Sequence, residues 1–392
     1  MAKREAPINA EILKWARIDA GLSISDVSTS TKISQDKLND WEQGENNPSV
    51  VQLEKLAKEY FRPALTFYLN EPPEPTSNIA DFRTISDDIV NHSNNLRQLV
   101  ARTKARQDEI VELLLEEDES PPLIDFIGKF SVKDSAHDIA SHMRSLFFAK
   151  GSPRNRLDKD SYFRWIRNRA QDLGVYVLLQ GDLGSHHSDI QPEEFRGFAL
   201  VHPIAPFVVI NDNDAKAALI FTLLHELAHL WVGNSGISNA NPFDASVNLK
   251  RLEILCNEVA GEFLMPEKAF KDVWKLNKHL ELNEAIVEIS KNFHVSRAAV
   301  AYRLKLHKLI SNAEWFRLYS LYKSQWRARK TKQRDSDGAP NYTIIRKYQL
   351  GERLIKTVLN ALDTGDLSYI RASRILGTNS KHFKNLRPED AF

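Results

Sequence analysis

The chain has 392 residues, too many for one ordinary hydrophobic core, so we expect two or three domains. Hydrophobic residues make up 42% of it and charged residues 27%, a globular composition that excludes fibrous and disordered proteins. The formal net charge is +1, from 53 basic and 52 acidic residues, so the charge of the whole chain gives no argument for nucleic-acid binding.

The sequence shows no signal peptide, no membrane-spanning stretch and too few cysteines for a disulfide. The N-terminal residues lack the apolar core of a signal peptide, and no stretch approaches the roughly 18 apolar residues that a membrane span requires. We therefore expect a cytoplasmic protein with no membrane contact. The only cysteine is Cys256, which allows neither an internal disulfide nor a cysteine-based zinc site. Any metal must be held by histidines and carboxylates.

The N-terminal part predicts a small all-α domain at residues 1–71. Residues 8–70 read as short helices that are interrupted by turn and capping residues at 21–23, 33–34 and 44–48. Several helices within such a short stretch can enclose a small core of their own.

A linker and a charged helix come next. Three prolines within residues 72–75 exclude a helix and favour an extended connector. Residues 86–117 show a heavily charged helical pattern that ends at a second group of acidic residues and prolines. We assign residues 72–120 to a linker with a bracing helix.

The remaining sequence predicts an α+β region that is predominantly α. Two helical stretches precede three short β-type runs, and helices then take over again. The helical stretches are at about 135–149 and 159–173, and the β-type runs are at 175–179, 197–202 and 207–210. A small sheet followed by helices indicates an α+β domain rather than alternating βαβ units. We place this domain at residues 121–325, and a basic linker with a C-terminal helical segment at 326–392.

Residues 215–232, AKAALIFTLLHELAHLWV, carry the strongest chemical signal in the chain. They are apolar almost all round a helical wheel, which predicts a buried helix. His225 and His229 are four residues apart, so both imidazoles lie on one helix face at the spacing that zinc needs from two ligands. Glu226 projects about 100° round from His225 and is suited to take a proton from a zinc-bound water.

A catalytic zinc of this kind needs a third protein ligand, and the next helix offers two candidates. In residues 251–264, RLEILCNEVAGEFL, Glu253 flanks one edge of the apolar stripe and Glu262 flanks the other. Periodicity does not choose between them. Asn257, one turn after Glu253, could orient that carboxylate by a hydrogen bond. Cys256 reads most simply as a small core residue.

Five ordered segments within residues 80–325 resemble the ImmA/IrrE family of metallopeptidase-like regulators. They are Asp81-Phe82-Arg83, FRGFALVHPIAPFVVIN, FTLLHELAHLWVG, LEILCNEVAGEFLMP and FHVSRAAVAYRL. The resemblance implies a zincin-like domain in which Glu253 is the third zinc ligand and Glu226 is the general base. It also implies limited proteolysis of a helix-turn-helix repressor in a stress or mobile-element response.

The same resemblance suggests how a substrate could bind. The strand at 197–202 would be the edge strand that receives an extended peptide, although a plain core strand explains the same residues. Tyr302 and Arg303 are the available candidates for stabilising an oxyanion, and helix packing is the simpler role for both.

Residues 9–67 resemble an XRE-type helix-turn-helix, similar to those of phage repressors. The matching text runs from Leu13 to Gly21 and continues as SISDVSTSTKISQDKLNDWEQGENNPSVVQLEKLAKEY. The resemblance implies a recognition helix that Ser34 caps and that ends near Gln43. The residues expected in the core are Leu38, Trp41 and Leu53. The residues expected to face the major groove of DNA are Gln35, Asp36, Lys37 and Asn39.

The chemistry of this face suits DNA, although its charge does not add to the case. Glutamine and asparagine can read adenine, and Lys37 can reach guanine or phosphate. Ile24 stands where the family often has a phosphate-binding glutamine, and Lys32 replaces a common glycine. Residues 1–70 carry 9 basic and 10 acidic side chains, about −1, which is a weak electrostatic footprint. Because base readout and phosphate contact are separate contributions, we still expect DNA binding.

Two further segments allow more than one interpretation. A second helix-turn-helix-like segment at about 285–310 occurs in ImmA/IrrE-like chains as part of the peptidase-associated region, and structural packing is its simpler role. Residues 323–334, KSQWRARKTKQR, contain six basic residues and Trp326. Phosphate contact and a solvated linker explain this stretch equally well.

Two functional hypotheses follow. In the first, the chain is a DNA-binding transcriptional regulator and a zinc-dependent metalloendopeptidase that cleaves a repressor-type or other protein partner. In the second, it is a non-hydrolytic antitoxin-like or repressor protein whose metallopeptidase fold is a sensor or scaffold for a toxin partner, as in toxin-antitoxin loci. Either protein would bind an operator through residues 9–67. A homodimer would suit paired half-sites, since helix-turn-helix proteins commonly bind two of them.

Overall fold

The computed structural model describes residues 5–20, 22–60, 62–72, 93–118, 120–151, 157–183, 188–214, 216–234, 236–238, 247–333 and 342–387. Its contacts divide the chain into two compact units, residues 1–114 with 182–190 and residues 115–181 with 191–392. The segment Asp81-Phe82-Arg83 and the start of the helix expected over 86–117 lie outside the described residues. None of the described helices combines the length and the apolar character that crossing a membrane requires.

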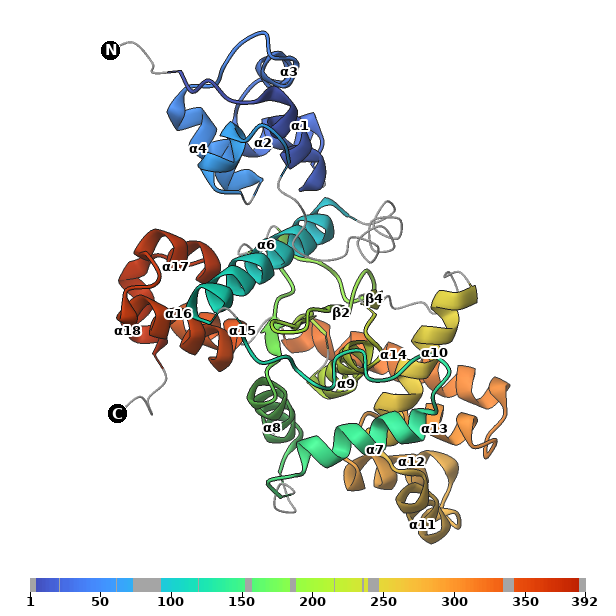
Figure 1. Cartoon of the computed structure of the whole chain (residues 1–392). Helices are drawn as coiled ribbons and strands as arrows, with labels where there is room; N and C mark the ends of the chain where they lie inside the picture. Colours follow the sequence, from blue (N-terminus) through green and yellow to red (C-terminus); the bar gives the residue numbers. More distant parts are fainter. Residues whose placement is uncertain are drawn as a thin grey trace. The chain divides into compact units, whose positions relative to one another are not determined.

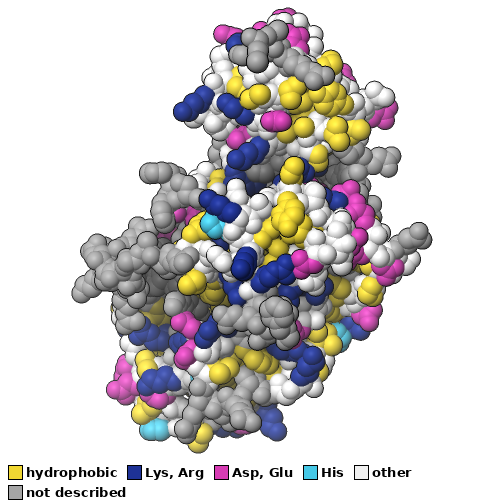
Figure 2. Space-filling model, turned by 90° about the vertical axis from the view of Figure 1, so that its left-hand side faces the viewer, with side chains coloured by type: hydrophobic (Ala, Val, Ile, Leu, Met, Phe, Trp, Pro, Cys, Tyr) yellow, Lys and Arg dark blue, Asp and Glu magenta, His cyan; other side chains and the backbone are white. Residues whose placement is uncertain are grey.

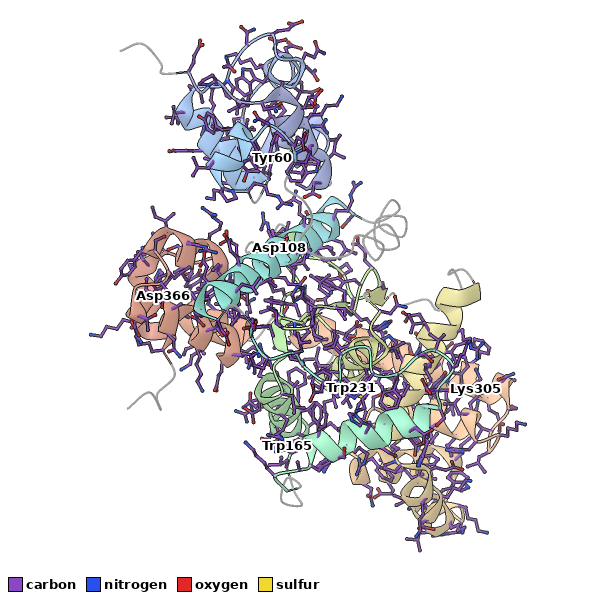
Figure 3. All side chains as sticks on the ribbon, viewed as in Figure 1. Tyr60, Asp108, Trp165, Trp231, Lys305 and Asp366 are labelled. Atoms are coloured by element: carbon purple, nitrogen blue, oxygen red, sulfur yellow. The ribbon has the colours of Figure 1, made fainter. Side chains whose placement is uncertain are left out.

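Short helices form the N-terminal part of the first unit, as the sequence predicts (Figure 1). They are α1 (Ala10–Asp19), α2 (Ile24–Thr31), α3 (Gln35–Gln43), α4 (Val50–Glu59) and the 3-10 helix η1 (Ala64–Tyr68). The side chains of Asn9, Ser23 and Ser49 cap α1, α2 and α4 by accepting a first-turn backbone N–H. These helices enclose a core of their own, in which Tyr60 is fully buried (Figure 3).

The second unit begins with helices and a small sheet. The long helix α6 (Asn94–Glu117) leads into it from the first unit. The elements that follow are α7 (Ala136–Phe147), α8 (Lys159–Asp172), β1 (Tyr176–Leu179), β2 (Gly197–Leu200), β3 (Phe207–Ile210), α9 (Lys216–Val232) and β4 (Gly236–Ser238). The two helices and the first three strands lie where the sequence predicts them. Their order confirms an α+β fold with a small sheet.

The strand order of the described sheet is β1-β3-β2-β4, with β1 and β3 parallel and the other pairs antiparallel. Of the two interpretations of the strand at 197–202, the edge strand is therefore wrong, and the plain core strand fits the structure. On its outer side β2 pairs with β4, with Gly197 opposite Ser238 and Ala199 opposite Gly236. Residues 236–238, Gly-Ile-Ser, have no apolar alternation, so the sequence pattern gave no sign of this strand.

Helix α9 packs against β2 and β3, and α10 (Val247–Leu264) packs against α9 and α7. Trp231 of α9 is fully buried and stacks on Phe126 with 3.8 Å between the ring centroids, in the main core of this unit (Figure 3). The helices α11 (Glu267–Asn277), α12 (Leu282–Asn292), α13 (Arg297–Leu306) and α14 (Asn312–Gln333) follow. This packing fixes the two helices that carry the predicted zinc ligands.

The C-terminal helices are anchored to the same unit by a buried arginine. These helices are α15 (Tyr342–Leu350), α16 (Glu352–Thr364), α17 (Tyr369–Leu376), the 3-10 helix η3 (Ser380–His382) and α18 (Phe383–Leu386). Arg167 of α8 donates hydrogen bonds to the carbonyls of Val177 in β1 and Tyr348 in α15, at 2.7 and 2.6 Å. Burial lowers the pKa of Arg167 to about 10. The guanidinium stays charged at neutral pH and joins α8, β1 and α15.

Candidate metal centre

Helix α9 places two histidines in an apolar environment. His225 is 4% exposed and His229 is 0% exposed, and the leucines around them belong to the main core. Burial of two imidazoles among leucines is costly unless a partner satisfies their ring nitrogens. The four-residue spacing puts both rings on one face of the helix, with 5.0 Å between the ring centroids.

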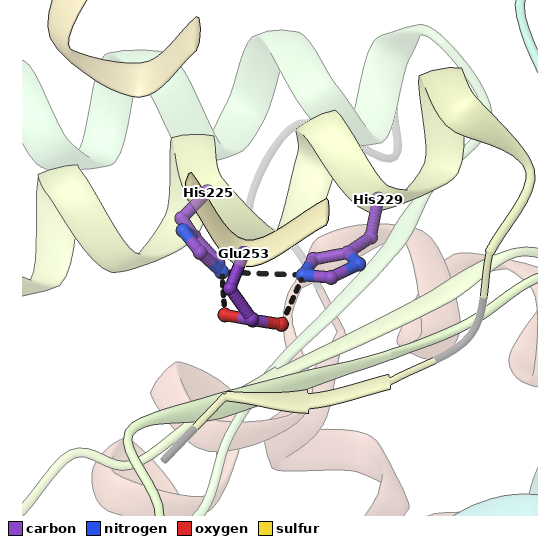
Figure 4. A group of neighbouring side chains, drawn as sticks. All are labelled: His225, His229 and Glu253. Carbon is purple, nitrogen blue, oxygen red and sulfur yellow. Dashed lines mark hydrogen bonds and ion pairs between the residues drawn. The ribbon is translucent and has the colours of Figure 1, made fainter. Parts of the chain in front are cut away.

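Helix α10 brings a carboxylate to the same point (Figure 4). Glu253 lies with Oε2 3.1 Å from Nε2 of His225 and with Oε1 3.2 Å from Nε2 of His229. The two Nε2 atoms are themselves 3.2 Å apart. One ligand atom from each side chain can therefore be chosen so that all three lie within 4.8 Å of one another.

These separations fit a zinc ion. Zinc–nitrogen bonds of about 2.0–2.1 Å at tetrahedral angles place two ligand atoms about 3.3 Å apart. The measured separations of 3.1 and 3.2 Å are close to that value. Two imidazoles and one carboxylate are also a ligand set of catalytic zinc sites, in which a fourth position is left for water. The residues present thus suit zinc in both chemistry and spacing.

A hydrogen bond outside the three residues orients His225. Its Nδ1 lies 3.1 Å from Oδ1 of Asn257, one turn along α10 from Glu253. An Nδ1–H that donates to this amide leaves Nε2 with a lone pair toward the cluster. The sequence analysis suggested a hydrogen bond between Asn257 and the carboxylate of Glu253, whereas in the structure Asn257 is hydrogen-bonded to the imidazole of His225.

The cluster is strongly coupled electrostatically. Burial alone would lower the pKa of His229, but Cys256 and Glu253 raise it well above its ordinary value. Burial alone would raise the pKa of Glu253, but the two histidines hold it far below its ordinary value. The acid is thus ionised at neutral pH. A metal ion would compete with the proton on His229, as is general for histidine ligands.

Glu226 occupies a fully buried position on α9 beside β2. A β-carbon placed on Gly197 would lie 2.8 Å from Oε1 of Glu226 and 3.0 Å from Cγ2 of Thr222. The missing side chain of Gly197 therefore gives the Glu226 carboxylate its space. The sequence showed Gly197 only as the start of a strand, because a close approach between two elements leaves no local pattern.

The other candidate acid has a different role. Glu262 is paired with Arg303 of α13, and its Oε1 accepts the backbone N–H of Glu267 at 3.0 Å. Arg303 also donates to the carbonyl of Met265 at 3.0 Å. Glu262 is not part of the His225, His229 and Glu253 group. The pair joins α10 to α13, so Arg303 is engaged in packing, the simpler of its two predicted roles.

The predicted DNA-reading residues lie on the surface of α3. Gln35, Asp36, Lys37 and Asn39 are all exposed, whereas Leu38, Trp41 and Leu53 are buried, which confirms the predicted core. Ser34 occupies the N-cap position of α3, but its side chain makes no capping hydrogen bond. The helix ends at Gln43, as predicted, before the left-handed Gly44.

A hollow of about 440 Å³ lies beside this face, where α3 and α4 begin. Its lining includes Lys32, Lys37 and Lys55, together with Ser34 and Ser49. Lys32 has φ 59 and ψ 31, a left-handed conformation that disfavours side chains by roughly 1–2 kcal/mol. The sequence showed Lys32 as a departure from the family pattern and did not single out Lys55, which only the tertiary structure brings to the hollow.

Two family models match the chain in this order. Residues 13–67 match a helix-turn-helix family. Residues 170–305 match the IrrE N-terminal-like domain. The resemblance drawn from the sequence is therefore confirmed in both parts. No curated protein matches the chain. The helix-turn-helix indicates a DNA-binding regulator, and the IrrE-like part indicates a metallopeptidase-like fold of a typically metal-dependent family.

Proposed function

We propose that the chain is a DNA-binding transcriptional regulator with a zinc metallopeptidase domain that cleaves a protein partner. The observation that carries the proposal is the convergence of two Nε2 atoms and one carboxylate on α9 and α10. The match of residues 170–305 to a metallopeptidase-like family supports it. The substrate class is a repressor-type or other protein, in a stress or mobile-element response.

In this proposal His225, His229 and Glu253 hold the metal, and Asn257 keeps the imidazole of His225 in the required tautomer. Zinc bound there would acidify a water molecule to a pKa near about 7 and make it a nucleophile. Glu226 accepts the proton at a carboxylate oxygen and returns it to the leaving amide nitrogen of the cleaved peptide. Its complete burial keeps bulk water from competing for that proton.

The N-terminal helices serve operator binding in the same proposal. The exposed Gln35, Asp36, Lys37 and Asn39 face the bases, and Lys32 and Lys55 of the hollow contact phosphates. Lys32 and Lys55 then supply phosphate contacts that the low net charge of residues 1–70 does not suggest. A homodimer on two half-sites belongs to the proposal.

Separate cores support the domain boundaries that we propose. The core of the first domain uses buried residues between Ala6 and Phe67, within residues 1–71. The main core of the peptidase domain uses buried residues between Phe126 and Tyr322, within residues 121–325. Residues 72–120 connect the two domains, and residues 326–392 follow the second.

Metal content is the first test. Elemental analysis of the purified chain should give about one zinc per molecule, because the ligand set offers one tetrahedral site. The His225→Ala/His229→Ala variant should lose it, and a His279→Ala variant, which changes an exposed histidine on the same unit, should keep it. A chain that binds no transition metal after reconstitution would refute the enzyme proposal.

Cleavage is the second test, and it separates the two functional hypotheses. Host proteins are incubated with the wild-type chain or with Glu226→Gln, and new protein N-termini are identified by mass spectrometry. New termini that need Glu226 support the peptidase, since this residue acts on the water and not on the ion. Equal sets of termini, with zinc bound in both proteins, would favour the non-hydrolytic regulator that binds a toxin partner.

A further inference from the structure

The C-terminal part of the chain repeats the arrangement of the first three helices. Helix α16 corresponds to α1, α17 to α2 and the segment 380–386 to α3, and matched residues are 345 positions apart in the sequence. Helix α1 ends at Asp19 and α16 at Thr364, and α2 and α17 each have 8 residues. The second copy lies outside both family matches. Its last helical segment is shorter than α3 and opens with a 3-10 turn.

The turn between the second and third helices has the same backbone in both copies. Lys32 has φ 59 and ψ 31, and Gly377 has φ 58 and ψ 34. The next residue, Ile33 or Thr378, is buried, and the one after it occupies the N-cap position of the third helix. Two short helices joined by a turn of three or four residues, which often contains glycine, are the arrangement of a helix-turn-helix.

The buried positions and the caps correspond as well. Ser23 caps α2 and Ser368 caps α17, each by accepting the backbone N–H three residues later. The matched buried pairs are Leu13 and Val358, Ala16 and Ala361, Val27 and Ala372, Leu38 and Phe383, and Trp41 and Leu386. Only four of the matched positions in 10–41 and 355–386 hold identical residues, so the repeat is recognised from the structure rather than from sequence identity.

Charge distinguishes the two copies. Residues 355–386 hold five basic and two acidic side chains, a net charge of +3, whereas the matched residues 10–41 hold four basic and five acidic ones, a net charge of −1. Lys381 stands at the position of Asp36, and Lys384 at that of Asn39. Both lysines are exposed on the third helix, as are Ser380 and Asn385. Figure 2, which faces the side of the molecule that carries the C-terminal helices, shows dark-blue Lys and Arg side chains among apolar and acidic ones.

The segment at 285–310 gives a useful contrast. It also turns at a left-handed residue, His294 with φ 56, and Ser296 then caps α13. Its second helix is packed against α14, and Ala301 stands buried at the position of Asn39 and Lys384. The packing role predicted for this segment therefore fits its structure. A turn of this kind presents a reading face only where the second helix stays exposed.

We propose that α16, α17 and the segment 380–386 form a second helix-turn-helix that binds double-stranded DNA. Ser380, at the position of Gln35, faces the base edges, and Lys381 and Lys384 reach the neighbouring phosphates. Arg371 and Arg387 are ion-paired with Glu116 and Asp363, at 3.0 and 2.6 Å, so the two lysines carry the exposed charge of the third helix. The proposal does not depend on the metal site or on the N-terminal helix-turn-helix.

The test uses the full-length chain and a fluorescent duplex of about 30 random base pairs. Binding is followed by anisotropy between about 50 and 200 mM salt. The variant Lys381→Ala/Lys384→Ala should bind about tenfold more weakly at low salt, and its slope of log K against log salt should be shallower by about 1.8, or 0.9 per phosphate contact. The variant Lys381→Arg/Lys384→Arg keeps both charges and should bind as the wild type does.

A matched control removes two exposed lysines elsewhere on the same unit. Lys268→Ala/Lys275→Ala on α11 should leave affinity and slope unchanged, which excludes a mere loss of net charge. Lys32→Ala/Lys37→Ala reports on the N-terminal site separately, so failure of one DNA site does not imply failure of the other. Wild-type affinity and slope in Lys381→Ala/Lys384→Ala would overturn the proposal.

Discussion

The carboxylate of Glu226 lies against the backbone of Gly197, so closely that a β-carbon at Gly197 would come within 2.8 Å of Oε1 and 2.9 Å of Cγ. No side chain larger than hydrogen fits between α9 and β2 at this point. The position of the proposed general base is thus set by a residue on another element. Real β-carbons essentially never make contacts under 3.0 Å, so a substitution must move something.

Gly197→Ala should displace Glu226 and reduce cleavage by about 100-fold, because misplacement by about 1 Å can cost that much. Zinc content should stay near one per chain, since the ligands are on α9 and α10. We also expect unfolding in urea to become easier by about 1–3 kcal/mol from overpacking. Gly261→Ala is the control, because its nearest neighbours would lie 3.9 Å away. Full activity of Gly197→Ala would contradict this account.

Asn257→Ala should weaken zinc binding by about 10- to 100-fold, the usual effect of losing a hydrogen bond that orients a metal ligand. The reason is the 3.1 Å contact between Oδ1 of Asn257 and Nδ1 of His225. Competition with a chromophoric chelator measures the affinity. Asn292→Ala, which changes an exposed asparagine at the end of α12, should bind zinc as tightly as the wild type does. Equal affinities for both variants would remove Asn257 from the site.

Acid should destabilise the second unit partly through Glu262. Burial alone would raise its pKa, but the Glu267 backbone N–H and the Arg303 guanidinium hold it below its ordinary value of 4.5. Because the pKa is lower in the folded state, the stabilisation is present above the unfolded value and is lost as the pH falls through the folded one.

The measurement is the free energy of unfolding of the wild type and of Glu262→Gln between about pH 6 and pH 3. Glu262→Gln should be less stable than the wild type at pH 6, because Arg303 is left buried without its anionic partner. The difference should shrink as the pH falls below the unfolded value of 4.5, because the carboxyl of the unfolded chain then takes up a proton more readily than the folded one does. A difference that stays constant over this range would show that the titration of Glu262 does not contribute.

Gly351→Ala should loosen the attachment of α15 and α16. Gly351 has φ 76, and a β-carbon there would lie 2.6 Å from Oε1 of Gln171 and 2.9 Å from the carbonyl oxygen of Val177. We expect a loss of about 2–4 kcal/mol from strain and overpacking together. Gly365→Ala, at φ 89 and ψ 1 in the left-handed region and with open space around it, should lose only about 1–2 kcal/mol. Equal losses in urea unfolding would mean that neither the crowding nor the backbone conformation of Gly351 adds to the loss.

The sequence by itself determined the local elements and the chemistry of the metal motif. The apolar helix with His225 and His229 at i and i+4, the acids on the next helix and the short N-terminal helices are patterns of neighbouring residues. Periodicity and capping residues report such patterns directly. The order of the two family matches could likewise be inferred from ordered motifs, because each motif is contiguous.

Only the tertiary structure decided relationships between elements that are distant in the chain. The helical periodicity of α10 left Glu253 and Glu262 equivalent, and only the family resemblance favoured Glu253. The packing of α10 on α9 brings Glu253 to the histidines, and Glu262 pairs with Arg303 of α13. The sequence left open whether β2 is an edge strand or an inner strand, since β4, its outer neighbour, is too short to show an alternating pattern. The repeat 345 residues apart is hardly detectable from sequence identity. A helix-turn-helix requires buried side chains at certain positions and one left-handed turn residue, and many different amino acids meet these two requirements.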